Sequence, residues 1–488
     1  MRKTENGKRK ASLFNAASRD AGTEPMNTKL PSTPRPTGSG LGYEIRRTLL
    51  LAGPLIVGQV TSFGMNFVDT IMAGRLGRVD LGAIAIGSSV WAAGLLFVLG
   101  VLMSVSPAVS QLDGAGRRLQ AGEMTRQALW IALAISVLLA LGARNAGWVM
   151  AALEVEPSVA GLALGYLKAM SWGAPALTMM FVLRFFSEGA GYTRPTMYIG
   201  ILGIVFNVPL NYIFMFGKLG FEPMGAVGCG WATALVFWLQ FIGLALYIRH
   251  RRQYAEFELY QGFSRPSPRE IRGLLRVGLP IGVTIFFEGS LFVSAALLIG
   301  TLGALPIAAH QVAINFASMA FMVPLGMAGA ITVRVGNALG RGDPHGARIA
   351  GLVGIGLAMM FAVFSSSLMY LLPEWIARMY TAEREVIELA ASLLMLAAIF
   401  QVSDGLQVAS AGALRGYKDT RRPMIYSVFS YWAIGLATGY WLTFEREWGA
   451  AGMWVGMIAG LSVAAVLLGT RFLRLSRATQ EIRLPARA

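Results

Sequence analysis

The sequence has one cysteine and three histidines among its 488 residues. The single thiol, Cys229, excludes an internal disulfide and any cysteine-based metal or iron–sulfur site. Charged residues are scarce as well, at 14% of the chain, whereas soluble domains carry about a quarter. This composition excludes an ordinary soluble protein of this length.

Motifs for nucleotide binding and hydrolysis are also missing. The sequence contains no G-x-x-x-x-G-K-[ST] loop, no H-E-x-x-H and no G-x-S-x-G. We therefore expect a protein that is not an enzyme and that carries no cofactor. Any work that it does is expected to draw on an ion gradient.

Hydrophobic residues make up 55% of the chain and gather into segments of about 20 residues, the length that crosses a bilayer. This pattern predicts an all-α polytopic membrane protein with twelve transmembrane helices. The expected spans are residues 48–71, 81–107, 125–150, 160–186, 194–216, 226–248, 274–302, 307–334, 346–372, 387–411, 424–444 and 450–473.

The net charge of +16 comes from basic residues between the apolar segments and at the chain ends, so it is a topology signal and does not indicate nucleic-acid binding. Two loops on the side of both tails are rich in arginine and lysine, whereas the opposite side is sparse or acidic. We expect both termini in the cytoplasm and the protein in a bacterial inner membrane. The basic residues are Arg249, Arg251, Arg252, Arg265, Arg269, Arg272 and Arg276 in one loop, and Arg415, Lys418, Arg421 and Arg422 in the other.

The middle basic loop divides the spans into two groups of six. A shift of 226 residues superposes the first group on the second without a gap, pairing Pro54 with Pro280 and Gly114 with Gly340. A parallel repeat of this kind predicts two bundles related by a pseudo-two-fold axis along the membrane normal. The expected parts are a disordered cytoplasmic tail (1–44), a first lobe (45–248), a cytoplasmic linker (249–273), a second lobe (274–474) and a C-terminal tail (475–488).

Three acidic residues lie inside the expected spans, where a charge is costly and indicates function. Asp69 lies near the outer part of the first span. Glu288 lies twelve residues beyond Arg276, about 18 Å into the membrane, and Asp404 lies at a comparable depth. Glu288 and Asp404 are therefore expected to face a common cavity, whereas each acid alone could also serve only packing.

Carboxylates in an apolar cavity can bind a cationic substrate and exchange it for a proton. Sodium is the alternative coupling ion, with a possible site at Glu288 and Asp404. Asn207 and Asn211 are possible polar ligands of the cavity, although interhelical hydrogen bonding around Pro209 explains them equally well. His310 has no second histidine nearby, which favours a packing role over metal binding.

Several motifs in this order resemble the multidrug and toxic compound extrusion (MATE) family, and within it the bacterial NorM-like branch. They are Leu51-Ala52-Gly53-Pro54, Phe67-Val68-Asp69-Thr70-Ile71-Met72-Ala73-Gly74, Asn207-Val208-Pro209-Leu210-Asn211-Tyr212, Ala309-His310-Gln311-Val312 and Leu414-Arg415-Gly416-Tyr417-Lys418-Asp419.

The resemblance implies antiport of organic cations, often aromatic drugs or dyes, against sodium or protons by a monomer that rocks two six-helix bundles. It implies cation coupling by Asp69, Glu288 and Asp404. The long N-terminal tail departs from the family pattern, and so does Ala295, which occupies the repeat counterpart of Asp69. This difference argues against a symmetric mechanism.

Two other classes of function are open to the sequence. A flippase for a lipid-linked saccharide or polyprenyl carrier would share the architecture, but its anionic cargo calls for basic residues in the spans. The membrane subunit of an ATP-driven pump would need a separate ATPase chain.

Overall fold

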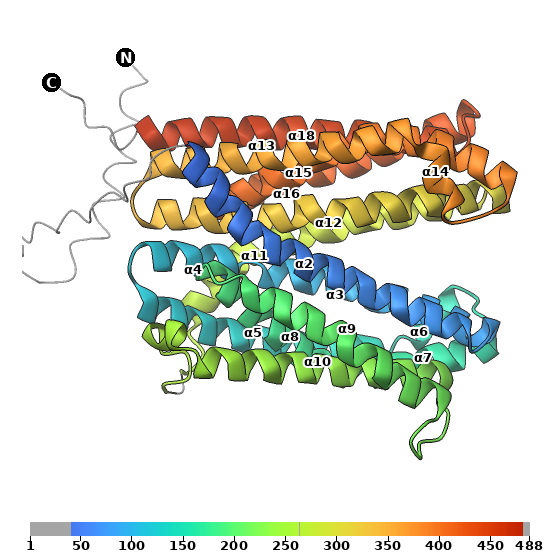
Figure 1. Ribbon diagram of the computed structural model, residues 1–488, viewed down its shortest axis with the longest axis horizontal. Coiled ribbons are helices and arrows are strands. Elements are labelled where there is room, and N and C mark those ends of the chain that lie inside the picture. Colours follow the sequence, from blue (N-terminus) through green and yellow to red (C-terminus); the bar gives the residue numbers. More distant parts are fainter. Residues whose placement is uncertain (1–40, 263, 482–488) are drawn as a thin grey trace, which may run out of the picture. The chain divides into compact units, whose positions relative to one another are not determined.

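Helices are the only regular elements in the computed structural model, which describes residues 41–262 and 264–481 (Figure 1). The first half contains α2 (Leu41–Gly74), α3 (Arg78–Leu102), α4 (Val105–Gly114), α5 (Arg118–Arg144), α6 (Gly147–Ala152), α7 (Pro157–Ser171), α8 (Ala174–Gly189), α9 (Arg194–Phe216) and α10 (Gly225–His250). After η2 (Arg252–Phe257), the second half contains α11 (Pro268–Gly300), α12 (Ala304–Gly340), α13 (Pro344–Leu371), α14 (Pro373–Arg378), α15 (Arg384–Gly416), α16 (Arg421–Val428), η3 (Phe429–Leu436), α17 (Ala437–Tyr440), η4 (Trp441–Glu445) and α18 (Ala450–Glu481).

The described helices account for the twelve expected spans. Ten are long and apolar enough to cross a membrane, with α3 and α4 counted together, and the bent pair α7 and α8 forms another. The remaining span is the unbroken helical run from α16 to η4, in which η3 and η4 are π-helical. The all-α polytopic fold predicted from hydropathy is therefore confirmed.

The fourth span, predicted over 160–186, is not one continuous helix in the structure. It is broken into α7 and α8, which meet at an angle of 50°. The break lies at Trp172 and Gly173, just before Pro175. Proline lacks an amide hydrogen and crowds the preceding turn, so a helix bends or restarts at this point.

Several element ends also differ from the predicted boundaries. Residues 1–40 of the expected tail lie outside the described residues, but α2 is already helical at Leu41. At the other end, α18 continues to Glu481, seven residues beyond the predicted end of the lobe. Arginine is a good helix former, and Gln480 in the extension accepts a hydrogen bond from Arg348 Nη1 at 3.0 Å, which favours the added turns.

The turns that follow α4 and α12 are built alike. Each contains a glycine with a left-handed backbone, Gly116 (φ 71°) and Gly342 (φ 76°), a conformation that other residues adopt only with strain. The two glycines are 226 positions apart, the same shift that relates the two sequence halves. The repeat seen in the sequence is therefore also a repeat of backbone geometry at these turns.

The two halves have separate buried cores. One cluster of buried side chains lies within residues 73–274 and a second within 291–464. A third joins the start of α2, through Ala52 and Leu55, to α12, α13, α15 and α18 of the second half. Helix α2 also packs on α9, so it contacts both halves of the chain.

Glycines allow close contacts between the halves along α3–α11, α2–α12 and α4–α12. A Cβ atom at Gly114 would overlap the carbonyl oxygen of Asn337, and one at Gly340 would overlap that of Gln111. The interface is further fixed by a hydrogen bond from Asn337 Nδ2 to Asp113 Oδ2 (3.1 Å) and one from Gln111 Nε2 to the Gly416 carbonyl (2.8 Å). The two halves therefore touch through their backbones at this end.

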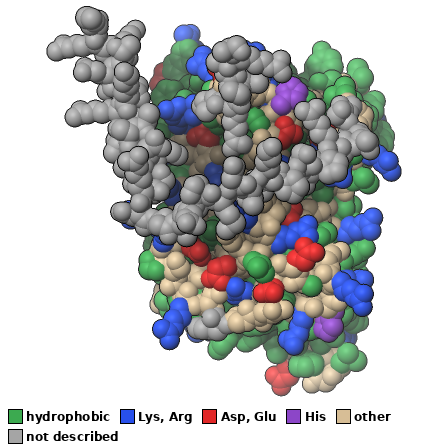
Figure 2. All heavy atoms as spheres, turned by 90° about the vertical axis from the view of Figure 1, so that its left-hand side faces the viewer, with side chains coloured by type: hydrophobic (Ala, Val, Ile, Leu, Met, Phe, Trp, Pro, Cys, Tyr) green, Lys and Arg blue, Asp and Glu red, His purple; other side chains and the backbone are tan. Residues whose placement is uncertain are grey.

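Charged side chains gather on the end of the molecule shown in Figure 2. The linker packs there against the first half: Phe257 of η2 is fully buried, and Arg118 bridges Asp113 and Glu256. Tyr254 lies 2.5 Å from the Ser187 hydroxyl, and burial raises the pKa of Tyr254 to about 12. Since its phenol stays protonated at physiological pH, this contact holds the linker in place.

Candidate transport site

Asp69 is buried in the first half, on the α2 face that packs against α9. Its carboxylate accepts a hydrogen bond from Asn211 Nδ2 at 2.5 Å, and Asn211 in turn donates to Asn207 Oδ1 at 3.2 Å. The two asparagines are four residues apart, so both amides lie on one face of α9. The structure thus joins three residues that the sequence suggested separately.

Asp69 lines a cavity of about 200 Å³ between α2, α3, α7, α8, α9 and α10. Aromatic and methionine side chains form much of the wall. They include Met65, Trp91, Tyr166, Met170, Met180, Phe181 and Phe237. An acid beside aromatic ring faces suits an organic cation, because both attract positive charge.

The basic residue at this cavity is already paired. Arg184 lines the wall, but its Nε donates to Glu188 Oε1 at 2.8 Å one helical turn away. Thr196 Oγ1 donates to the same carboxylate oxygen at 2.9 Å. Arg184 and Glu188 therefore neutralise each other, and Asp69 remains the acid in the cavity wall without a cationic partner.

Glu288 and Asp404 lie in the second half, on α11 and α15. They interact electrostatically with each other. That they face a common cavity stays a prediction. Asp404 is 3% exposed, and its Oδ1 has no hydrogen-bond partner among the described residues, while Glu288 is half-buried. Two acids that interact in this way favour a cation between or beside them.

The sequence analysis assigned Arg415 to a cytoplasmic loop. In the structure it belongs to the last turn of α15, is half-buried and interacts electrostatically with Glu288. Arg415 interacts with Glu288, so the charge of Asp404 is the one left for a further cation to balance. Basic residues near span ends usually report topology, so sequence alone gave no sign of this inward role.

Other polar groups surround the acids of the second half. Gln407 Nε2 donates to the Tyr431 hydroxyl at 2.6 Å, and Tyr431 interacts electrostatically with Glu288. Gln401, one helical turn before Asp404, is fully buried and has no hydrogen-bond partner for either side-chain atom among the described residues. The spacing of Gln401, Asp404 and Gln407 along α15 could have predicted this polar cluster, because residues three positions apart lie on one helix face.

The two other residues singled out from the sequence are both buried. His310 is buried, with its ring 5.8 Å from that of Trp454, and Cys229 is a buried free thiol. Among residues 41–262 and 264–481, no group of three or more His, Cys, Asp or Glu side chains is placed to hold a metal ion. Glu288 and Asp404 form a pair of carboxylates, and sodium binding there stays a prediction.

Two bundles of helices with buried acids in each half define a polytopic membrane transporter. The MatE family model matches residues 54–213 and 280–441, and the two matched segments start 226 positions apart. The chain belongs to the MatE family.

Similarity to two named relatives extends over most of the chain. The Probable multidrug resistance protein NorM of Xanthomonas campestris pv. campestris is 44% identical over 434 residues, which cover 89% of this chain and 95% of that protein. Multidrug resistance protein NorM of Aliivibrio fischeri is 42% identical over 439 residues, with the same two coverages. These matches confirm the resemblance to the NorM-like branch.

Solved structures show the same fold at lower identity. The eukaryotic MATE transporter AtDTX14 superposes with a TM-score of 0.82 at 21% identity, covering 91% of this chain and 99% of its own. A multidrug resistance MATE transporter in an outward-facing conformation superposes with a TM-score of 0.83 at 20% identity, covering 90% and 97%.

Proposed function

We propose that this protein is a multidrug efflux antiporter that exports organic cations in exchange for sodium ions or protons. The observation that carries the proposal is Asp69, a carboxylate without a cationic partner in the wall of an aromatic cavity. A flat cation gains from the ring faces and from the carboxylate together. The relatives named multidrug resistance proteins support this choice over a flippase for anionic lipid-linked cargo.

The second half supplies the groups for the coupling ion. Glu288 and Asp404 interact with each other, and Arg415 compensates one of the two negative charges. Placing the second charge in an apolar interior is costly unless a proton or sodium ion joins it. Binding of the ion in this half would therefore be favourable whenever the site opens to the side of high ion concentration.

Exchange requires that the cavity opens to one side of the membrane at a time. The contacts from Gly114 to Asn337 and from Gly340 to Gln111 close one end of the molecule. If these contacts separate while each half moves as one bundle, that end opens. We expect a monomer to suffice, because each half of the single chain supplies one bundle.

The closed end is proposed to face the cytoplasm of a bacterial inner membrane. The basic linker and the basic turn after α15 both lie at this end, where the positive-inside rule places them. Cysteines at the exposed residues Gln261 and Ala382 should then be labelled from opposite sides of intact cells, against a buried Cys229 background. Labelling of both from outside would contradict this orientation.

Inverted membrane vesicles test the exchange directly. A fluorescent organic cation should accumulate in them when a sodium gradient or a pH gradient is imposed, and the effective gradient identifies the ion. Asp69→Asn should remove binding of the dye to purified protein, since it removes the charge but keeps the side-chain volume. Dye accumulation that needs ATP and persists without either gradient would overturn the proposal.

A further inference from the structure

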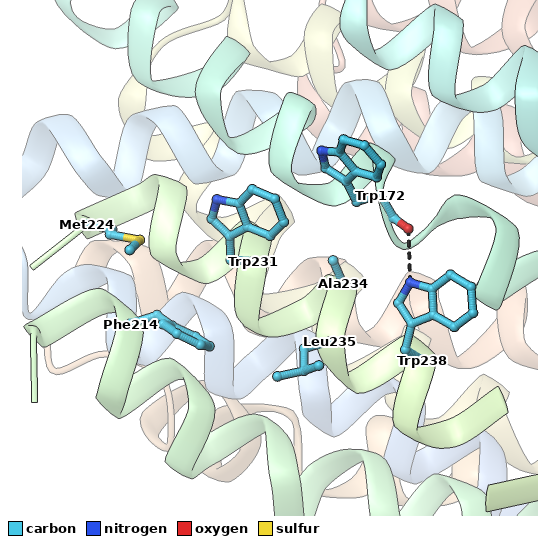
Figure 3. Close-up of a pocket in the computed structure, with 7 residues that line it drawn as sticks. All are labelled: Trp172, Phe214, Met224, Trp231, Ala234, Leu235 and Trp238. Atoms are coloured by element: carbon cyan, nitrogen blue, oxygen red, sulfur yellow. Dashed lines mark hydrogen bonds between the residues drawn. The ribbon is translucent and has the colours of Figure 1, made fainter. Parts of the chain in front are cut away.

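A groove of about 420 Å³ in the first half is lined by seven residues (Figure 3), none of which lines the cavity that holds Asp69. Its floor is one face of α10, formed by Trp231, Ala234, Leu235 and Trp238, and Trp172 at the bend between α7 and α8 forms a wall. Phe214 and Met224 complete the lining. The volume lies within the range of about 300–1,000 Å³ that is typical of ligand sites.

The indole nitrogen of Trp238 is engaged within the fold. It donates to the carbonyl oxygen of Trp172 at 3.1 Å, which satisfies this backbone group at the helix bend (Figure 3). The rings remain free for apolar contact, and Trp172 is 57% exposed. Because α9 and α10 are both membrane spans, this exposed face borders the hydrocarbon of the bilayer.

A positive charge lies beside the groove. The Cζ atom of Arg144, in the last turn of α5, is 4.7 Å from the ring centre of Trp172, and its Nε donates to Ser171 Oγ at 2.8 Å. Arg144 is exposed, and none of the salt bridges among the described residues includes it. Its terminal nitrogens thus have donors available for an external anion, which a planar guanidinium binds well.

Arg144 lies in the last turn of α5, at the end of a membrane span. The next residues of the chain carry Trp148 and Leu153, which are 73% and 63% exposed, and exposed tryptophans are enriched at the boundary between lipid and water. A long arginine side chain at the end of a span can extend toward the lipid headgroups.

We propose that this face binds one phospholipid, with its phosphodiester on Arg144 and an acyl chain in the tryptophan groove. The apolar lining excludes a polar ligand from the groove, and the unpaired guanidinium selects a lipid with a phosphate over a neutral one. The bound lipid would stabilise the bend between α7 and α8, because Trp172 is one of the two residues at the break. The site does not depend on the transported substrate.

A matched arginine in the second half provides a control. Arg446 lies over the ring of Trp441 with the same distance of 4.7 Å, and it is also exposed. It stands between Glu445 and Glu447 in the sequence, whereas Arg144 is flanked by Ala143 and Asn145. The acids compete with a phosphate at Arg446, so Arg446 should not hold a lipid.

The test uses delipidated full-length protein in detergent and a photoactivatable phosphatidylglycerol with the reactive group in its acyl chain. Cross-links should map to the segment around Trp231 and Leu235. Arg144→Gln should weaken lipid binding about tenfold, the loss expected for a charge-assisted hydrogen bond, and Arg446→Gln should leave it unchanged. Trp231→Ala should reduce the cross-links while the protein stays folded.

Three outcomes would overturn the proposal. Equal labelling by a diacylglycerol with the same photoactivatable chain would show that the phosphate contributes nothing. Equal losses in Arg144→Gln and Arg446→Gln would show a general effect of surface charge. Cross-linking between two copies through the Trp231 face would assign the groove to a protein interface instead.

Discussion

The two halves of the protein are alike where they touch and unlike where they carry charge. At the crossing of α4 and α12, Gly114 lies on the Asn337 carbonyl and Gly340 on the Gln111 carbonyl. The shift of 226 residues relates Gly114 to Gly340, and it also relates Gln111 to Asn337. The contact is therefore reciprocal, as an interface on a two-fold axis must be.

The same reciprocity continues deeper in the membrane. Gly100 packs on the backbone of Gly282, and its counterpart Gly326 packs on the backbone of Ile56. The pairs on α3–α11 and on α12–α2 are again related by the same shift. The glycine contacts between the two halves therefore form a symmetric set.

The interiors lack this equivalence. The counterpart of Asp69 is Ala295, which is fully buried, and the counterpart of Glu288 is Ser62, whose hydroxyl donates to the Gly58 carbonyl at 2.8 Å. The first half thus has an acid in an aromatic cavity, and the second has two interacting acids. This difference is the basis for the proposed division between the two halves, in which the first half binds the substrate and the second binds the coupling ion.

The largest expected effects come from the acids. Glu288→Gln and Asp404→Asn should each reduce gradient-driven efflux at least about tenfold, because each removes a charge that holds the ion. Both variants should still bind dye in the Asp69 cavity. Vesicle transport and dye binding to purified protein measure the two effects separately.

Glu388→Gln is the control for the acid variants. Glu388 is on α15 like Asp404, but it is exposed and pairs with Arg384 on the surface. Its loss should leave transport unchanged. Loss of dye binding in Glu288→Gln would show that the two halves share one site, and the division proposed above would then be wrong.

Smaller effects are expected at the symmetric interface. Gly114→Ala and Gly340→Ala should each destabilise the folded protein by about 1–3 kcal/mol, because each new methyl group meets a backbone oxygen that cannot move away easily. Gly356→Ala in α13, with no neighbour within 4 Å, should have no such cost. Thermal unfolding is monitored through the reaction of the buried Cys229 with a maleimide dye, which gives the midpoint of the unfolding transition for each variant.

The interface comparison would be contradicted by unequal changes. If Gly114→Ala lowers the midpoint and Gly340→Ala does not, the two contacts differ in strength despite their equal geometry. Equal changes would support a pseudo-symmetric closure.

The sequence predicted what depends on local composition. Hydropathy gave the spans, and the cost of buried charge singled out Asp69, Glu288 and Asp404. Hydropathy did not predict the break at Gly173, since a window of about 19 residues averages over a bend. The Asp69–Asn211 contact joins residues 142 positions apart, so only the packing of α2 on α9 reveals it.

The smallest predicted effect concerns two equivalent helix starts that differ in one side chain. Asp343 caps α13 by accepting a hydrogen bond from the Gly346 amide at 2.8 Å, whereas its counterpart Arg117 gives α5 no side-chain cap. Asp343→Ala should therefore lower the free energy of unfolding by about 1 kcal/mol, and Arg117→Asp should raise it by up to about 1 kcal/mol, since a carboxylate satisfies free amides and favours a helix N-terminus. The Cys229 labelling assay measures both shifts. A lower midpoint in Arg117→Asp would mean that the exposed Arg117 stabilises its own turn, and that the halves differ in structure even at the ends where their backbones match.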